Sequence, residues 1–340
     1  MSPRNVALLG AIAVALTLSA PPPSLSQSGE PLSVLSGLDR ENTEELLQAY
    51  QASTGETFEY EVQAGPTEDL IAHLRIELAS GSSDVGLLIM AIPQLQLLDS
   101  QFDLFEPLES VSPDAILDTL SFDGIAETVP FGLAVYTLMY NTDKIAEGDK
   151  PTSFADLLDE KFDNQVGLAS PMTSANVWNV FWFLTEEMEG EPYGWPFFEA
   201  LQERQPTYTS GHGALRDLVI SGERGIGIQT TDNIAAPMDR GESVSYSFPS
   251  EGVPTSVWGA GVPAAGDNAE LAERIVAWLL SDDGQDWVVN GANLVPVSAG
   301  SDYTFKEGTR LADLELKLTD VDYVERERAN VIRQFQALSR

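Results

Sequence analysis

The sequence predicts an α/β protein with two lobes, each a mostly parallel sheet flanked by helices. The chain has 340 residues, which exceeds what one compact core usually supports. Its first hundred residues alternate short apolar runs with amphipathic segments, a βαβαβ pattern typical of a helix-covered parallel sheet. A longer apolar stretch, residues 130–144, indicates a strand that crosses between the lobes and ends at a Tyr-Asn turn.

The first lobe is predicted element by element. Residues 32–36 form a short buried strand, and residues 41–53 form a helix that stops at Gly55. Residues 57–62 alternate as a strand, a helix opens near Thr67, and residues 85–90 form the next buried strand. In such sheets ligands bind outside the carboxyl ends of the strands. We therefore expect residues 36–37, 64–67 and 90–92, among them Ser36, Gly65 and Thr67, to face a cleft.

The second lobe is predicted from the crossing strand onward. It contains a strand at 166–170, helices at 175–188 and 195–205, and a strand at 226–228. A Gly-rich strand at 256–262 returns to the first lobe. A helix at 270–280 then completes that lobe, and the tail at 313–338 docks on the second lobe. Two crossings predict a hinge.

Polar residues at strand ends are the candidate ligand contacts of the second lobe. The hydroxyls of Thr173 and Ser174 and the amides of the following helix start suit an anionic or polar group, although either residue also suits a plain N-cap. Ser210 occupies another expected cleft edge. Thr231 and Asp232 follow the strand at 226–228, where Asp232 either caps the next helix or binds an amine.

Two aromatic residues are candidate walls of the cleft. Tyr136 lies in the first crossing strand and Trp258 in the returning one. Aromatic rings supply stacking surface and attract cations. The other tryptophans are expected in the core, because they lie at helical spacing: Trp178, Trp182, Trp195, Trp278 and Trp287.

The chain is strongly acidic, with 53 Asp and Glu against 18 Lys and Arg. The acidic residues are scattered, which indicates a solubility adaptation to a salty exterior, as in a halophilic or marine host. A cation-capturing surface is the alternative, and it would require the charges to converge. No basic patch is present for binding nucleic acid.

Catalytic motifs are missing from the sequence. It has no cysteine and only two histidines, His73 and His212, which are interpreted as structural or surface residues. No zinc-ligand spacing and no nucleophile elbow accompanies them. We therefore expect no catalytic residues, no metal ligands and no cofactor.

The N-terminus predicts export. Arg4 precedes an apolar run at 6–18 that is too short for a membrane span, so residues 1–26 are interpreted as a signal peptide cleaved near Gln27. Without cysteine no lipid can be attached at the mature terminus. These features predict a soluble periplasmic protein.

Several segments, in their order and spacing, resemble the solute receptors that serve ABC importers. They are the crossing strand at 130–144, the turn and helix at 151–158, the Ser-Gly-Glu-Arg strand entry at 221–228 and the helix at 272–285. The group resembled includes receptors for ferric ion, phosphorylated sugars, aminoethylphosphonate and thiamine.

The resemblance implies a type II periplasmic-binding-protein fold without catalysis. It implies a signal peptide at 1–26, lobe 1 at 27–130 and 258–299, lobe 2 at 131–257, and C-terminal helices at 300–340 that dock on lobe 2. The implied function is to bind a small polar, anionic organic solute. The implied partners are that solute, a membrane permease and its ATPase, with the receptor itself a monomer.

Two alternatives remain open. Ferric members of the group carry two adjacent tyrosines after the strand that corresponds to 226–228, where this chain has residues 230–233, Thr-Thr-Asp-Asn. They also carry a histidine near the first strand and an acidic residue after the third, and this chain departs at both places. A ferric receptor would therefore lack the usual tyrosine pair. A secreted hydrolase is the other alternative.

Overall fold

Strand β4 (Val129–Asn141) is the central element of the fold, and all 13 of its residues are buried. The computed structural model describes residues 30–65, 67–120, 122–174, 176–320 and 323–338. The first part of β4 pairs with β9 (Val253–Gly261) and β10 (Val295–Pro296), and its second part pairs with β7 (Ile226–Thr230) and β8 (Val244–Ser247). Strand β4 therefore belongs to both halves of the sheet.

The strands follow the order β2-β1-β3-β9-β4-β7-β5-β6. The first half of the sheet contains β1 (Leu32–Ser36), β2 (Tyr60–Ala64) and β3 (Leu87–Ala91), which are parallel. The second half contains β5 (Val166–Ala169), β6 (Thr207–Thr209) and β7, also parallel. Strands β4 and β9 join the halves in antiparallel pairing. The predicted α/β class with parallel, helix-flanked strands is confirmed.

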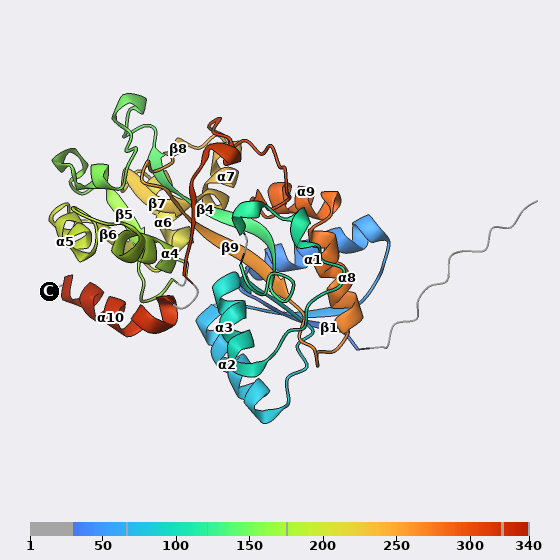
Figure 1. Cartoon of the computed structure of the whole chain (residues 1–340). Coiled ribbons are helices and arrows are strands. Elements are labelled where there is room, and N and C mark those ends of the chain that lie inside the picture. The colour runs from blue at the N-terminus through green and yellow to red at the C-terminus, as the bar shows by residue number, and fades with distance from the viewer. Residues whose placement is uncertain (1–29, 66, 121, 175, 321–322, 339–340) are drawn as a thin grey trace, which may run out of the picture. The chain divides into compact units, whose positions relative to one another are not determined.

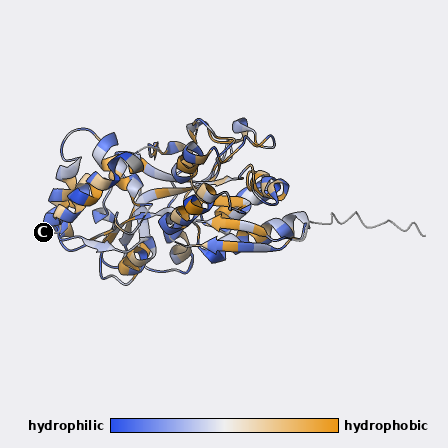
Figure 2. Ribbon diagram, turned by 90° about the horizontal axis from the view of Figure 1, so that it is seen from below, coloured by the Kyte–Doolittle hydropathy of each residue, from blue (hydrophilic) through white to orange (hydrophobic). Residues whose placement is uncertain are grey.

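Helices cover both halves (Figure 1). Those of the first half are α1 (Arg40–Thr54), α2 (Thr67–Ser80), α3 (Ile92–Phe102), α8 (Ala269–Leu279) and α9 (Asp282–Asn290). Those of the second half are α4 (Trp178–Trp182), α5 (Trp195–Glu203), α6 (His212–Ile220), α7 (Thr231–Asp239) and α10 (Tyr323–Leu338). Figure 2 shows hydrophobic residues on several strands, and hydrophobic and hydrophilic residues alternating along the helices.

Helix α1 shows how the sequence determines a boundary. Its N-cap Asp39 accepts a hydrogen bond from the amide of Asn42 at 2.8 Å, and its C-cap Gly55 has φ 73°, which favours glycine. Leu46, Leu47 and Tyr50 lie on the buried face. The predicted helix at 41–53 is confirmed within two residues at each end.

The C-terminal part packs on the second half of the sheet. Helix α10 contacts α4 and α5, and the ring of Phe335 meets that of Tyr208 with centroids 4.7 Å apart. Before α10, strand β11 (Leu316–Leu318) pairs in parallel with β9, a pairing that the sequence did not predict.

The predicted helix at 175–188 is shorter and less regular than expected. Helix α4 covers Trp178–Trp182 and continues as a π-helical segment over Phe183–Glu187. The predicted signal peptide at 1–26 lies outside the described residues. Within the described ranges, no helix has the length and apolar character required to span a membrane.

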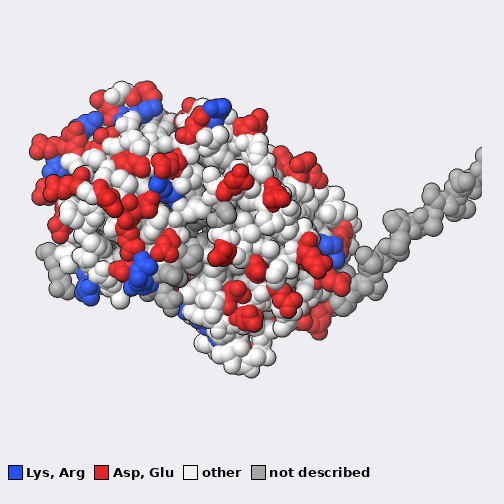
Figure 3. Space-filling model, viewed as in Figure 1, with Lys and Arg blue, Asp and Glu red and all other residues white. Residues whose placement is uncertain are grey.

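Acidic side chains are spread widely over the face shown in Figure 3, and basic side chains are few. Many of the basic groups are paired: Arg274 lies 2.6 Å from Glu56 and Arg326 lies 2.6 Å from Glu186. Exposed pairs of this kind contribute only about 0 to 1 kcal/mol each. The negative charge is therefore a diffuse property of the surface in this view.

Candidate functional site

A cavity of about 580 Å³ lies where loops from both halves of the sheet meet β9. Gly37 follows β1, Gly65 follows β2 and Pro171 follows β5, so three of its walls come from the carboxyl ends of parallel strands. Helices α2, α4, α6 and α10 and strand β9 also contribute lining residues, among them Trp258 on β9 and Arg328 on α10. Residues from position 37 to position 328 thus converge on one space.

Five of the ten predicted site residues line this cavity: Gly65, Thr67, Thr173, Ser174 and Trp258. Thr173 and Ser174 lie in the turn after β5, where their amides bond to the carbonyl of Ser170 at 3.2 and 3.0 Å. Their backbone donors are therefore used within the turn, while their side chains remain at the cavity wall. Trp258 is 7% exposed.

Ser36 and Tyr136 lie behind the lining. The hydroxyl of Ser36 accepts a hydrogen bond from that of Thr43 at 2.8 Å, which fixes the turn into α1. The buried hydroxyl of Tyr136 donates to the carbonyl of Asn176 at 2.6 Å. Both side chains support the cavity wall instead of forming it.

The other three predicted residues also lie off the lining. Ser210 is exposed in the bend before α6. Thr231 and Asp232 are the first two residues of α7, so Thr230, not Asp232, occupies the N-cap position. The carboxylate of Asp232 accepts a hydrogen bond from the side chain of Asn233 at 2.9 Å. Burial raises the pKa of Asp232 above its usual value.

Gly37 lies in a segment that was expected to face the cleft, and it does line the cavity. Eight further lining residues were not predicted as ligand contacts: Glu68, Asp69, Pro171, Met172, Asn176, Trp178, His212 and Arg328. His212 follows β6 and opens α6, so the strand-end rule that selected Ser210 also applied to it. Trp178, predicted for the core, is only 3% exposed and still borders the cavity. Arg328 comes from the tail, where no local motif identified it.

His212 is held at the wall by Tyr136. Its Nε2 atom lies 3.1 Å from the hydroxyl oxygen of Tyr136, and the two rings meet edge to face at 5.6 Å. Because Tyr136 donates its single proton to the carbonyl of Asn176, its oxygen accepts from Nε2–H. This assigns the Nε2-protonated tautomer. Burial lowers the pKa of His212 to about 4, so the ring is neutral at physiological pH.

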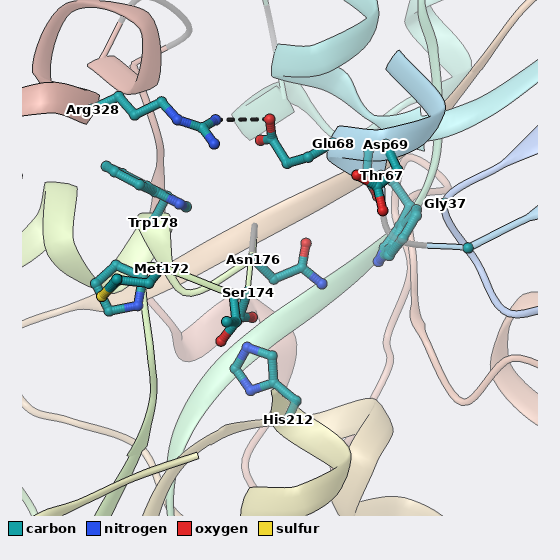
Figure 4. A pocket seen from close by; sticks show the side chains of 14 residues that line it. Gly37, Thr67, Glu68, Asp69, Met172, Ser174, Asn176, Trp178, His212 and Arg328 are labelled. Atoms are coloured by element: carbon teal, nitrogen blue, oxygen red, sulfur yellow. Dashed lines mark hydrogen bonds and ion pairs between the residues drawn. The ribbon is translucent and has the colours of Figure 1, made fainter. Parts of the chain in front are cut away.

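An ion pair crosses the rim of the cavity. The guanidinium of Arg328 on α10 lies 2.7 Å from the carboxylate of Glu68 on α2, as Figure 4 shows. Helix α10 packs on the second half of the sheet and α2 on the first, so this pair links the two halves. Both side chains are 45% exposed, which limits the strength of the pair.

Few hard metal ligands with a negative charge are found among the described lining residues. They are the carboxylates of Glu68 and Asp69, and no tyrosine is among the lining residues. In the described part of the chain, no group of three or more His, Asp or Glu side chains is arranged to hold a metal ion.

Comparison with known proteins identifies the relatives of this chain. The model of a family described as bacterial extracellular solute-binding protein matches residues 45–308. None of the curated protein sequences matches the chain.

Solved structures are similar over nearly the whole chain. Iron-bound HitA from Pseudomonas aeruginosa has 20% identity and a TM-score of 0.73, covering 91% of this chain and 99% of its own. AfuA from Actinobacillus pleuropneumoniae, with fructose-6-phosphate bound, has 17% identity and a TM-score of 0.72, covering 90% and 97%. A periplasmic thiamin-binding protein has 19% identity and a TM-score of 0.71, covering 93% and 98%. The fold is that of periplasmic binding proteins.

Proposed function

This chain belongs to the family of bacterial extracellular solute-binding proteins, and we propose that it captures a small polar organic solute for delivery to an ABC importer. The observation that carries the proposal is the cavity of about 580 Å³, which is lined from both halves of the sheet. A space of this size matches sites that enclose small ligands.

The proposed mechanism is closure of two lobes over the solute. The lobes are residues 27–130 with 258–299, and residues 131–257, with the tail at 300–340 on the second. Strands β4 and β9 are the segments that join them. A solute that contacts both lobes stabilises the closed form, because it makes those contacts only there. The closed form is then recognised by a permease and its ATPase. We place the receptor in the periplasm, as a monomer released from its signal peptide.

Hydroxyl and amide groups of the lining support a polar solute. Thr67, Thr173, Ser174 and Asn176 all present neutral hydrogen-bonding side chains at the cavity. These groups serve an anionic solute, which the sequence favoured, and they serve an uncharged or cationic one equally. The charge of the solute is therefore decided by the other lining groups.

Ferric ion is the second candidate, since HitA was solved with iron bound. Hard oxygen ligands such as phenolates would be needed to hold it. The lining provides no tyrosine, and its two carboxylates include Glu68, which is already paired with Arg328. Adding ferric citrate should therefore leave the protein colourless, and a phenolate charge-transfer colour would restore this candidate.

The test of the proposed function is thermal unfolding against a panel of amines, sugar phosphates, phosphonates, carboxylates and polyols. A solute at about a hundred times its Kd adds roughly 2.7 kcal/mol to the free energy of unfolding. We expect one solute class to raise the Tm, to bind one equivalent and to be recovered unchanged. Turnover of the solute would indicate a hydrolase.

A pair of variants ties the binding to this cavity. Ser174→Trp places an indole in the lining and should abolish the Tm shift. Ser210→Trp makes the same change at an exposed position off the lining and should retain it. Equal binding by both variants would place the solute elsewhere on the protein.

A further inference from the structure

A second, smaller cavity borders the Arg328 and Glu68 pair. Its volume is about 180 Å³, and its walls come from α2, α3 and α10. Glu68 and Arg328 line both this side cavity and the main one, so the ion pair is a wall that the two spaces share. The other residues of the side cavity do not line the main one: Ile71, Arg75, Pro93, Gln94, Leu97 and Val324.

The two cavities differ in the sign of their charge. The main cavity is lined by Glu68, Asp69 and Arg328, which leaves one negative charge in excess. The side cavity is lined by Glu68, Arg75 and Arg328, which leaves one positive charge in excess. The chain has 53 acidic and 18 basic residues, so a cavity with an excess positive charge stands out from the protein around it. Salt screens distant carboxylates, and the groups at the wall therefore decide what the side cavity attracts.

Arg75 on α2 is the source of the excess charge. It is partly buried, it has no ion-pair partner among the described residues, and its Nε atom is enclosed without a hydrogen bond. Its Nη1 and Nη2 atoms are not enclosed in this way, and they form no hydrogen bond to a described residue either. They are therefore available at the cavity wall. A partly buried cation without a counter-charge is costly, so this guanidinium calls for an anion.

Arg328 has further donors to offer in the same space. Its Nη1 atom lies 2.7 Å from Oε2 of Glu68, and Figure 4 shows this single contact as a dashed line. A guanidinium carries five N–H donors in a planar fork, which matches the two oxygens of a carboxylate. The donors on Nε and Nη2 of Arg328 are not used by Glu68.

Apolar side chains form most of the remaining wall. They come from all three helices: Ile71 on α2, Pro93 and Leu97 on α3, and Val324 on α10. Ile71 is only 5% exposed, so this part of the cavity lies directly on the core. Covering such surface with a hydrocarbon group is favourable, at about 25 cal/mol per Å². The wall thus combines a cationic end with an apolar one.

We propose that the side cavity is a second ligand site, which binds a small organic carboxylate with an apolar tail. The carboxylate pairs with Arg75 beside the unused donors of Arg328, and the tail lies against Ile71, Leu97 and Val324. A monoanion balances the single excess positive charge. An amine would be repelled by that charge, and an alcohol would leave it uncompensated. This site goes beyond the proposed function and is independent of the solute in the main cavity.

Titration calorimetry with three six-carbon compounds at one salt concentration tests the ligand class. The compounds are hexanoate, 1-hexanol and hexylamine. We expect one equivalent of hexanoate to bind saturably, with 1-hexanol about tenfold weaker and hexylamine weakest. Equally tight binding of 1-hexanol would show that only the apolar wall matters. That result, tighter binding of hexylamine, or no binding of hexanoate overturns the proposal.

A matched pair of charge variants tests Arg75. Arg75→Gln should weaken hexanoate binding about tenfold, as expected for one lost charge-assisted interaction. Arg240→Gln removes an exposed cation that pairs with Glu242 and lies off both cavities, so it should leave the Kd unchanged. Equal effects of the two variants would show that only the overall charge matters, which overturns the role of Arg75.

Three tryptophan variants test the location of the site. Leu97→Trp fills the side cavity and should abolish hexanoate binding, whereas Ile76→Trp, at a 71% exposed position of α2 off the lining, should retain it. Thermal unfolding shows whether both variants are folded. Ser174→Trp fills only the main cavity and should also retain hexanoate binding. Loss of binding in Ser174→Trp would place the carboxylate in the main cavity and overturn the second site.

Discussion

The hydroxyl of Tyr136 on β4 lies 3.1 Å from Nε2 of His212 on α6, and it donates at the same time to the carbonyl of Asn176 at 2.6 Å. One buried oxygen thus fixes both a cavity-lining ring and the loop after β5. It connects the central strand, which spans both ends of the sheet, to the wall that would contact a solute.

Tyr136→Phe should therefore lower both stability and solute affinity. Loss of the hydroxyl leaves the carbonyl of Asn176 and Nε2 of His212 without this partner, at a cost of about 1 to 3 kcal/mol. Tyr140→Phe is the control, because its hydroxyl donates to Glu147 at 2.7 Å and lies off the lining. Urea unfolding should measure the stability of both variants, and calorimetry should show lost solute affinity only for Tyr136→Phe. Equal affinities of the two variants would contradict a role of the Tyr136 hydroxyl in solute binding.

His212 should make the protein less stable in acid. Its pKa is about 4 in the folded protein, against 6.5 for an ordinary histidine, because burial disfavours the charged ring. Between these pH values the unfolded chain binds the proton and the folded protein does not, so stability falls as pH drops from 6.5 to 4. At about 1.4 kcal/mol for each pH unit, the loss is about 3 kcal/mol.

His212→Gln isolates this contribution. Asp232, with its raised pKa, acts in the opposite direction, since it contributes stability at low pH that is lost as pH rises through its folded value. Both proteins contain Asp232, so the difference between their pH profiles reports His212. The free energy of unfolding should depend less on pH in the variant between pH 4 and 6.5. Parallel profiles would show that the ring titrates normally.

Gly37→Ala should reduce solute affinity with little loss of stability. A Cβ at this position would lie 2.9 Å from Oγ1 of Thr67, so it displaces that lining side chain, and it would be in ordinary contact with the ring of Trp258 at 3.5 Å. Gly65→Ala is the control: it also lines the cavity, but no atom lies within 4 Å of its added Cβ. We expect the Kd to rise about tenfold, a change of ~1.4 kcal/mol, in the first variant and less in the second.

The Arg328 and Glu68 pair should couple the two halves weakly. A double-mutant cycle with Arg328→Gln and Glu68→Gln, followed by urea unfolding, should give a coupling of about 0.2 to 1 kcal/mol. High salt should remove it, because both side chains are exposed. A coupling that salt does not change would indicate a pair shielded from solvent.

Most helices and strands could be predicted from the sequence, but their detailed geometry and some of their pairings could not. Strands such as Leu32–Ser36 and Ile226–Thr230 and the helix ending at Gly55 follow from local periodicity and turn chemistry. The π-helical segment at Phe183–Glu187 was missed, because its backbone shift leaves the apolar pattern of a helix intact. The pairing of β11 with β9 was missed for a different reason, since it joins segments more than 50 residues apart.

For the site, strand-end reasoning located the correct loops without always selecting the correct residue. Gly37 lines the cavity, whereas its neighbour Ser36 turns inward to Thr43. His212 lines it, whereas Ser210 remains exposed outside the lining. A shift of one or two residues in a turn decides which side chain meets the solute. The tail was expected to dock on the second lobe, but composition and spacing do not specify which residue of α10 reaches the cavity, and Arg328 was therefore missed.

The two indoles at the cavity have a spectroscopic consequence. The chain contains six tryptophans, and only Trp178 and Trp258 are among the lining residues. A bound solute would replace water beside these two rings and leave the surroundings of the other four nearly unchanged. Intrinsic fluorescence therefore reports occupancy without any attached dye, and Trp178→Phe and Trp258→Phe would show which wall the solute touches first.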